Sequence, residues 1–121
     1  MKHSVSTLAQ TLQEFTLDPQ NRTVAFRHHS QQLTRIEFCL LEHLVHQEGY
    51  LVPRQDLLQI AWGLQVTVES RTVDSHIVRL RRKLRAIGSQ AFVIETVWGL
   101  GYRFRCLAQE EITLRKGKEK S

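Results

Sequence analysis

The 121-residue chain contains only two cysteines, Cys39 and Cys106. Neither belongs to a Cys-x-x-Cys pair or lies near a histidine at metal-ligand spacing, so the sequence indicates no disulfide framework and fits a reducing compartment. Long apolar runs are also missing: no stretch approaches the roughly 18 apolar residues of a membrane helix. Residues 1–15 lack the apolar core of a signal peptide. We therefore expect a soluble, cytoplasmic protein with no membrane partner.

Patterns that would predict catalysis or cofactor binding are equally scarce. Gly99 and Gly101 form a Gly-x-Gly in a predicted hairpin, not at a strand-to-helix turn, so they do not predict nucleotide binding. His43 and His46 share a helical face, but no acid or thiol completes a metal site there. No serine or cysteine has a histidine and an acid in a catalytic pattern on structured elements. We expect no enzymatic activity, no metal and no cofactor.

The charge balance is basic, with 17 Lys and Arg against 12 Asp and Glu and a formal charge of +5. This suits an anionic partner, although many proteins with no such partner are as basic. The length predicts one domain, which we place at residues 13–107. Residues 1–12 are expected to be a flexible lead-in. Residues 108–121 are polar and are expected to be a disordered tail.

Short β-like segments, then helical periodicity, then β-branched and aromatic segments follow one another along the chain. They predict an α+β fold: an N-terminal antiparallel sheet, three helices and a C-terminal β-hairpin. Thr34 and Glu37 have the spacing of a capping box at the start of the first helix. The expected strands lie at about 15–17, 22–27, 31–33, 92–98 and 102–106, and the expected helices begin near Thr34, Pro53 and Ser70. The second and third helices can form a helix-turn-helix unit, with the hairpin as a wing.

The third helix divides into two faces. At a period of roughly 3.6 residues, its core-facing stripe consists of Val73, Ile77, Leu80, Leu84 and Ile87. The opposite face carries Arg71, Ser75, Val78, Arg79 and Arg82, with Arg85 beside them. Asp74 is the one acid of this helix, so its arginines lack the acidic partners of an ordinary solvated face. Phosphates would complete such a surface, whereas the alternative is a solvated basic face. Arg81 and Lys83, on the flanks, are expected only to contact solvent.

Three strings, LTRIEFCLLEHL, SRTVDSHIVRLRRKL and IETVWGLGYRF, closely resemble the OmpR/PhoB-type winged-helix DNA-binding domain. The resemblance covers about residues 15–104. It implies the output domain of a bacterial two-component response regulator, which takes part in phosphorelay signal transduction and regulates transcription by binding a specific DNA sequence. The domain could equally be a stand-alone regulator without a receiver. The resemblance implies that helix 70–87 enters the major groove and that the wing, 92–106, lies at the backbone and minor groove.

Carried over position by position, the resemblance implies DNA contacts at Arg71, Ser75, Val78, Arg79, Arg82, Thr96, Trp98 and Arg103. Arg79 is the candidate for base contact, because arginine can bind a guanine edge with two hydrogen bonds. Arg71 and Arg82 are candidates for phosphate contacts or for mixed contacts. Trp98 stands where many members carry an arginine that enters the minor groove, although other members also carry Trp there. Trp cannot make that charged contact, so the alternative to a wing contact is that Trp98 packs or stacks at the backbone. Pro53 replaces a Ser or Thr that commonly caps the second helix.

Double-stranded DNA is thus the expected partner. The resemblance also implies RNA polymerase, through the loop 63–69, together with a receiver domain or a second copy on tandem half-sites. Fold alone does not fix function, so a protein-interaction module and a non-specific or RNA-binding protein remain alternatives.

Overall fold

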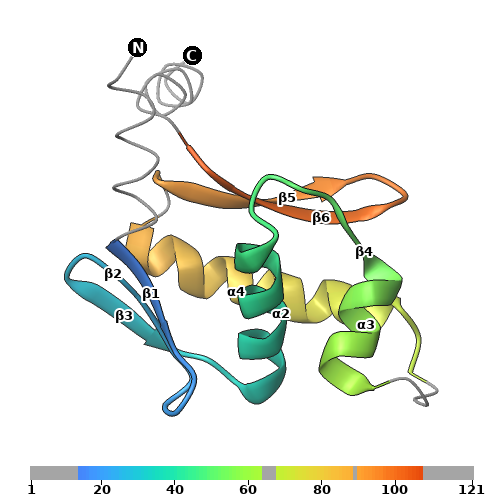
Figure 1. The fold of residues 1–121 in the computed structure, drawn as a ribbon, viewed down its shortest axis with the longest axis horizontal. Coiled ribbons are helices and arrows are strands. Elements are labelled where there is room, and N and C mark those ends of the chain that lie inside the picture. The colour runs from blue at the N-terminus through green and yellow to red at the C-terminus, as the bar shows by residue number, and fades with distance from the viewer. Residues whose placement is uncertain (1–13, 64–67, 89, 108–121) are drawn as a thin grey trace.

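The fold is described by a computed structural model for residues 14–63, 68–88 and 90–107. The expected lead-in, 1–12, and the expected tail, 108–121, lie outside these ranges. The described elements run in the order sheet, helices, hairpin, as the sequence predicts (Figure 1). None of the helices in this part of the chain is long and apolar enough to cross a membrane.

The N-terminal sheet has the strand order β1-β2-β3 and is antiparallel throughout. Its strands are β1 (Phe15–Asp18), β2 (Thr23–Phe26) and β3 (His29–Gln32). The expected strands at 22–27 and 31–33 leave residues 28–30 as a break between them, and this gap is too long, because Phe26 pairs directly with His29. The chain reverses within Arg27 and His28, and Arg27 adopts a positive φ of 55° that permits this short turn. His29 and Ser30 therefore belong to β3.

Helix α2 (Arg35–His46) begins with the predicted capping box. The Thr34 hydroxyl accepts from the Glu37 backbone N–H at 3.1 Å, and the Glu37 carboxylate accepts from the Thr34 N–H at 2.9 Å. Both donors would otherwise lack partners at the helix start. Glu37 is only 1% exposed, so this cap also brings a carboxylate into the core.

Helix α3 (Arg54–Trp62) is preceded by a two-residue strand, β4 (Val52–Pro53), which the sequence does not predict. Pro53 is the N-cap and has no side-chain cap hydrogen bond, so it lies one position before the expected first turn. Strand β4 pairs with Gly101 and Tyr102 of the hairpin. A Cβ at Gly101 would lie 2.1 Å from the Val52 carbonyl oxygen, so this close approach requires glycine.

Helix α4 (Arg71–Gly88) buries the predicted stripe of Val73, Ile77, Leu80, Leu84 and Ile87. The hairpin that follows consists of β5 (Phe92–Val97) and β6 (Gly101–Cys106). Residues 98–100 form its turn, in which Gly99 has a φ of +77°. The hairpin and β4 make the second sheet, ordered β4-β6-β5.

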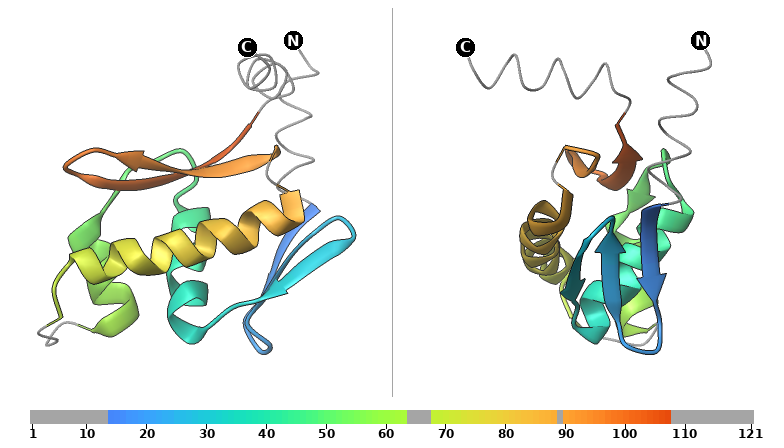
Figure 2. Two further views of the ribbon diagram at one scale, coloured as in Figure 1. Left: turned by 180° about the vertical axis from the view of Figure 1, so that it is seen from behind. Right: turned by 90° about the vertical axis from the view of Figure 1, so that its left-hand side faces the viewer.

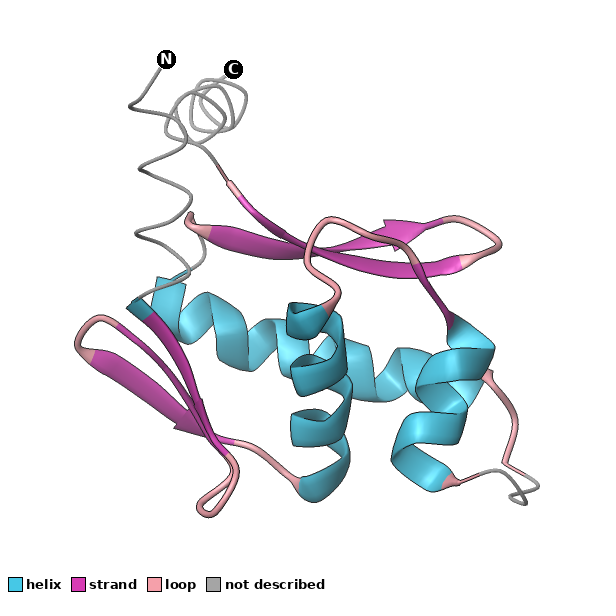
Figure 3. Ribbon diagram, viewed as in Figure 1, coloured by secondary structure: helices cyan, strands magenta, loops and turns pink. Residues whose placement is uncertain are grey.

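Among the described residues, helices α2, α3 and α4 have the N-terminal sheet at one end and the hairpin sheet along one side (Figure 3). One hydrophobic core joins both sheets to all three helices, with Phe15, Leu40, Leu57, Ile77 and Phe104 among its members. In the left-hand view of Figure 2, which is turned by 180° from Figure 1, α4 lies nearest the viewer and beside the hairpin. No other described element covers it in this view. The fold therefore holds α4 by one face and leaves the opposite face open.

Candidate nucleic-acid interface

The open face of α4 carries all five helix residues expected to bind DNA. Arg71, Ser75, Val78, Arg79 and Arg82 are all exposed. They recur at the spacing of one helical face, directly opposite the buried stripe. Arg85 is exposed too and continues this face toward the end of the helix. The sequence prediction of a basic face on this helix is confirmed.

The arginines of this face differ in whether an acid neutralises them. Arg71 pairs with Glu69 at 2.8 Å, so the expectation that it lacks a local partner is wrong. Both side chains are highly exposed, at 78% and 69%, and such pairs contribute about 0–1 kcal/mol. Within the described ranges, Arg79, Arg82 and Arg85 make no ion pair. These three guanidinium groups are the open cationic part of the face.

Ser75 and Val78 make the middle of the face low in profile. The Ser75 hydroxyl donates to the Thr72 carbonyl oxygen at 2.9 Å, so it folds back onto the helix. Val78 is 52% exposed and is apolar. Side chains of this size let the backbone of a helix approach a groove floor, and a valine methyl can contact a thymine methyl.

A groove of about 280 Å³ separates α4 from the tip of the hairpin. Val78 and Arg81 line it from the helix, and Thr96, Trp98 and Leu100 line it from the hairpin. Trp98 is 88% exposed. The structure therefore brings two of the three expected wing residues, Thr96 and Trp98, to the same groove as the α4 face.

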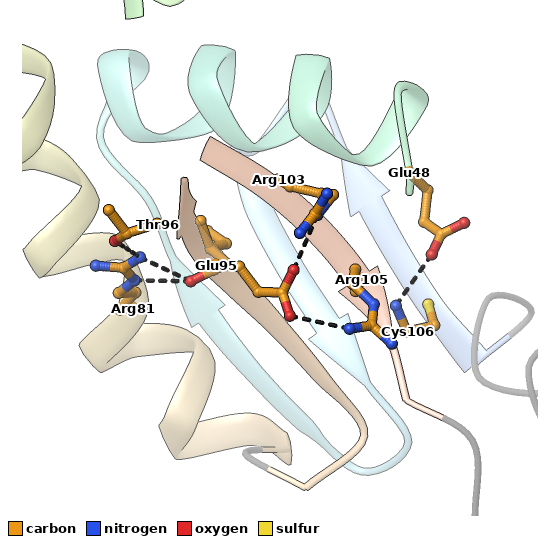
Figure 4. Close-up of polar contacts among 8 residues, drawn as sticks. Glu48, Arg81, Glu95, Thr96, Arg103, Arg105 and Cys106 are labelled. Carbon is orange, nitrogen blue, oxygen red and sulfur yellow. Dashed lines mark hydrogen bonds and ion pairs between the residues drawn. The ribbon is translucent and has the colours of Figure 1, made fainter. Parts of the chain in front are cut away.

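Arg81 connects the helix to the hairpin, and the expectation that it only contacts solvent is wrong. Its guanidinium donates to the Ile94 carbonyl oxygen from Nε at 3.0 Å and from Nη2 at 2.8 Å. Nη2 also donates to the Thr96 hydroxyl at 2.7 Å, as Figure 4 shows. The same group lies over the Tyr102 ring, 5.4 Å from its centroid. Arg81 therefore fixes the position of the wing relative to α4.

Asp74 ties the start of α4 to α3 and to the hairpin. It accepts hydrogen bonds from Arg54 and from the Tyr102 hydroxyl. Burial raises the pKa of Asp74, but these hydrogen bonds outweigh it and hold the pKa below the ordinary value of 3.8. Burial and the bond to Asp74 raise the pKa of Tyr102 to about 12. The sequence identifies Asp74 only as the one acid of this helix, near the helix start where the dipole favours an acid, so the network is an unpredicted part of the site.

Arg103 does not line the groove. It alternates with the buried Tyr102 and Phe104 along β6 and so lies on the opposite face of the hairpin. Its Nε donates to Glu95 at 2.9 Å, and Glu95 also accepts from Arg105 at 3.0 Å (Figure 4). Its DNA contact stays a prediction.

Two further expectations concern histidines and the loop before α4. No cluster of three or more His, Cys, Asp or Glu side chains that could hold a metal occurs in the described part of the chain. His76 packs edge-on against Trp62, with ring centroids 5.2 Å apart. Its Nδ1 is buried without a hydrogen-bond partner, and burial lowers its pKa.

The loop expected to contact RNA polymerase, 63–69, lies largely outside the described residues, because 64–67 are not described.

Comparison with known families agrees with this geometry. The family described as "Transcriptional regulatory protein, C terminal" matches residues 28–104. The chain belongs to this family. It is an OmpR/PhoB-type winged-helix domain, the DNA-binding output class of response regulators.

Similar proteins include regulators from several bacteria. Response regulator SaeR of Staphylococcus aureus is 35% identical over 91 residues, which are 75% of this chain and 40% of SaeR. The chain thus spans about 40% of the length of this curated relative. The DNA-binding domain of Bacillus subtilis CssR is 32% identical with a TM-score of 0.65, covering 74% of this chain and 98% of that domain.

A solved complex provides the most informative likeness. The RstA DNA-binding domain of Klebsiella pneumoniae, in complex with the RstA box, is 33% identical with a TM-score of 0.63. The match covers 76% of this chain and 91% of that one.

Proposed function

We propose that this winged-helix domain binds a specific double-stranded DNA sequence, with α4 in the major groove and the hairpin at the backbone and minor groove. The observation that carries this proposal is the open face of α4, where Arg79, Arg82 and Arg85 lack acidic partners among the described residues. Phosphate groups and base edges supply what these guanidinium groups lack.

The roles of the side chains follow from their places on this surface. Arg79 lies next to the small Ser75 and Val78, so we assign it base contact. Arg82 and Arg71 are assigned phosphate contact, and Arg71 exchanges its weak, exposed pair with Glu69 for a phosphate. Phosphate contacts fix the register of the protein, whereas base contacts give sequence preference.

The hairpin supplies the remaining contacts. Thr96 and Trp98 border the groove beside α4, and we assign them to the sugar–phosphate backbone and minor groove. Arg103 keeps its assignment as a DNA contact of the wing. It must leave its 2.9 Å pair with Glu95 or contact DNA with the guanidinium nitrogens not used there, so it is the weakest member of the set.

The wider role is transcription regulation in a bacterial cytoplasm, at the nucleoid. We propose that a receiver domain controls this output domain, that a second copy binds a tandem half-site, and that the loop 63–69 contacts RNA polymerase. The relatives named as response regulators support the first of these, because the chain matches only 40% of SaeR. No catalytic role is proposed for any residue of the domain.

The test is a binding titration with a duplex selected from a random library and a scrambled duplex of equal composition, repeated across salt concentrations. The proposal expects the selected duplex to bind at least ~10³-fold more tightly, with a steep loss of affinity as salt rises. Equal affinity for both duplexes, or binding that tRNA competes away equally well, would mean that the domain is not a sequence-specific DNA reader. No shift with any duplex would favour a protein partner.

A further inference from the structure

The tip of the wing exposes apolar side chains and carries no charge. Residues 97–101 read Val-Trp-Gly-Leu-Gly, and within them Trp98 is 88% and Leu100 58% exposed. Two large apolar side chains, two positions apart on a tight turn, open to water and lining one groove, mark a contact surface rather than a solvated turn. Because this tip has no cation, it does not contact a phosphate by charge.

The tip is continuous with the proposed DNA-binding face. Val78 of α4 and Trp98 and Leu100 of the tip line the same groove. One sugar–phosphate strand separates a major groove from the next minor groove. A wing that lies beside a helix in the major groove therefore meets that strand and the minor groove beyond it. The occupant that fits the tip is the duplex already bound by α4.

The tip is held in place rather than free to fold away. The Leu100 N–H donates to the Val97 carbonyl oxygen at 2.9 Å, and the Arg54 backbone N–H donates to the Leu100 carbonyl oxygen at 3.3 Å. The Arg81 side chain anchors the neighbouring Thr96 at 2.7 Å. The indole of Trp98 is thus presented from a rigid base at a fixed distance from α4.

We propose that Trp98 and Leu100 form an apolar minor-groove contact that selects a wide or easily deformed groove over a narrow A-tract. This inference rests on the proposed function. An A-tract has a narrow minor groove whose strong negative potential attracts arginine, and an indole beside a leucine gains nothing from that potential. Apolar side chains in the minor groove instead wedge against steps that unstack easily, such as TA. The tip therefore contributes to sequence preference without a charged contact.

The test uses the full 121-residue chain and a duplex selected from a random library. Hydroxyl-radical footprints of the wild type and of Trp98→Ala identify the flank that the wing protects. Three duplexes then differ only there, with an A-tract, alternating TA steps or G·C pairs. The wild type is expected to bind the TA flank several-fold more tightly than the A-tract. Trp98→Ala should lose affinity and this preference, with the salt slope unchanged because no charge is removed.

Trp98→Arg replaces the apolar indole with a cation at the same position. It should prefer the A-tract, and its salt slope should steepen by about 0.9 because one more phosphate charge is neutralised. Leu100→Ser tests the second side chain and should weaken the TA preference. Tyr50→Ala is the matched control: Tyr50 is 72% exposed, lies between α2 and β4, and does not line the groove. It should change neither affinity nor preference.

The outcomes distinguish a failure of the apolar wing contact from a failure of the proposed DNA binding by α4. If Trp98→Ala binds all three flanks as the wild type does, or if the wild type prefers the A-tract, the apolar contact is refuted while DNA binding by α4 stands. If the wild type does not separate the selected duplex from a scrambled one, the proposed function itself fails. Trp98 is almost fully exposed, so circular dichroism of its variants should match that of the wild type.

Discussion

Lys83 of α4 donates to the carboxylate of Glu37, 2.7 Å away, although Glu37 is only 1% exposed. The same ammonium donates to the Gln32 carbonyl oxygen at 3.0 Å. One side chain of the proposed recognition helix thus anchors the start of α2 and the end of β3. The flank position of Lys83 suggested solvent contact, and the structure shows that this expectation is wrong.

Removing Lys83 should destabilise the domain far more than an exposed lysine would. Lys83→Met leaves the Glu37 carboxylate buried without its cation, which costs about 3 kcal/mol in the free energy of unfolding. Urea denaturation measures this. The double variant Glu37→Gln/Lys83→Met should recover part of the loss, because glutamine still caps the Thr34 N–H and no charge is buried. A double variant no more stable than Lys83→Met would contradict this assignment.

Acid should destabilise the domain through Glu37 and Asp74. Burial raises the pKa of both, but hydrogen bonds from Lys83 and Thr34, and from Tyr102 and Arg54, outweigh it. Both pKa values therefore lie below their ordinary values of 4.5 and 3.8. A lowered carboxylate pKa gives stability that is complete above the ordinary value and is lost as the pH falls through the folded-state value. Thermal unfolding measured from pH 6 down to about pH 2 should show this loss.

The matched variant for the acid experiment is Glu37→Gln. It should be less stable than the wild type near neutral pH, and its stability should fall less steeply below about pH 4, because the lowered pKa of Glu37 then no longer contributes. Parallel curves for the two proteins would show that Glu37 is not a source of the acid sensitivity.

Tyr102 should ionise only near pH 12, because burial and its hydrogen bond to Asp74 raise the pKa of its hydroxyl to about 12. The stability that this group contributes is complete below its ordinary value of 10.0 and is lost as the pH rises through about 12. Ultraviolet absorbance of tyrosinate during alkaline titration measures the ionisation. Tyr102→Phe should remove the late step, and a variant that retains it would refute the assignment.

The two thiols should differ sharply in reactivity. Burial, with the nearby Glu48 carboxylate, raises the pKa of Cys106 to about 12, whereas Cys39 is half-buried. Because the thiolate is the reactive form, Cys106 in a Cys39→Ser variant should react with a disulfide reagent only as fast as the domain unfolds. In a Cys106→Ser variant, Cys39 should react while the protein is folded. Equal rates for the two variants would contradict the burial of Cys106.

Sequence patterns predicted most of what depends on periodicity and local caps. The buried stripe of α4, the capping box at Thr34 and the order of the elements are confirmed. The helical period alone determines which residues of α4 face the core, so the opposite face could be found without a structure. The short turn at Arg27 was misplaced because it uses a non-glycine residue at positive φ, which composition does not reveal.

Contacts between distant segments could not be predicted in this way. Arg81 lies beside the buried stripe, and only the register of β5 brings the Ile94 carbonyl within its reach. Strand β4 depends on a glycine in the hairpin 48 positions further along the chain, as the pairing of Pro53 with Gly101 shows. Arg71 was misjudged for a simpler reason, since its partner Glu69 lies just before the helix and was not counted with it.

The central claim is that the open face of α4 reads DNA, and the most direct measurement compares Arg79→Ala with Arg82→Ala. Affinity is measured across salt for the selected duplex and for duplexes with single base changes. The control is Arg22→Gln, which removes one positive charge in the turn between β1 and β2, outside α4. Arg79→Ala should cost about 1–3 kcal/mol and relax the preference at one base position. Arg82→Ala should weaken all duplexes alike and reduce the salt slope by about 1. If both variants bind every duplex as the control does, α4 is not the DNA-reading surface.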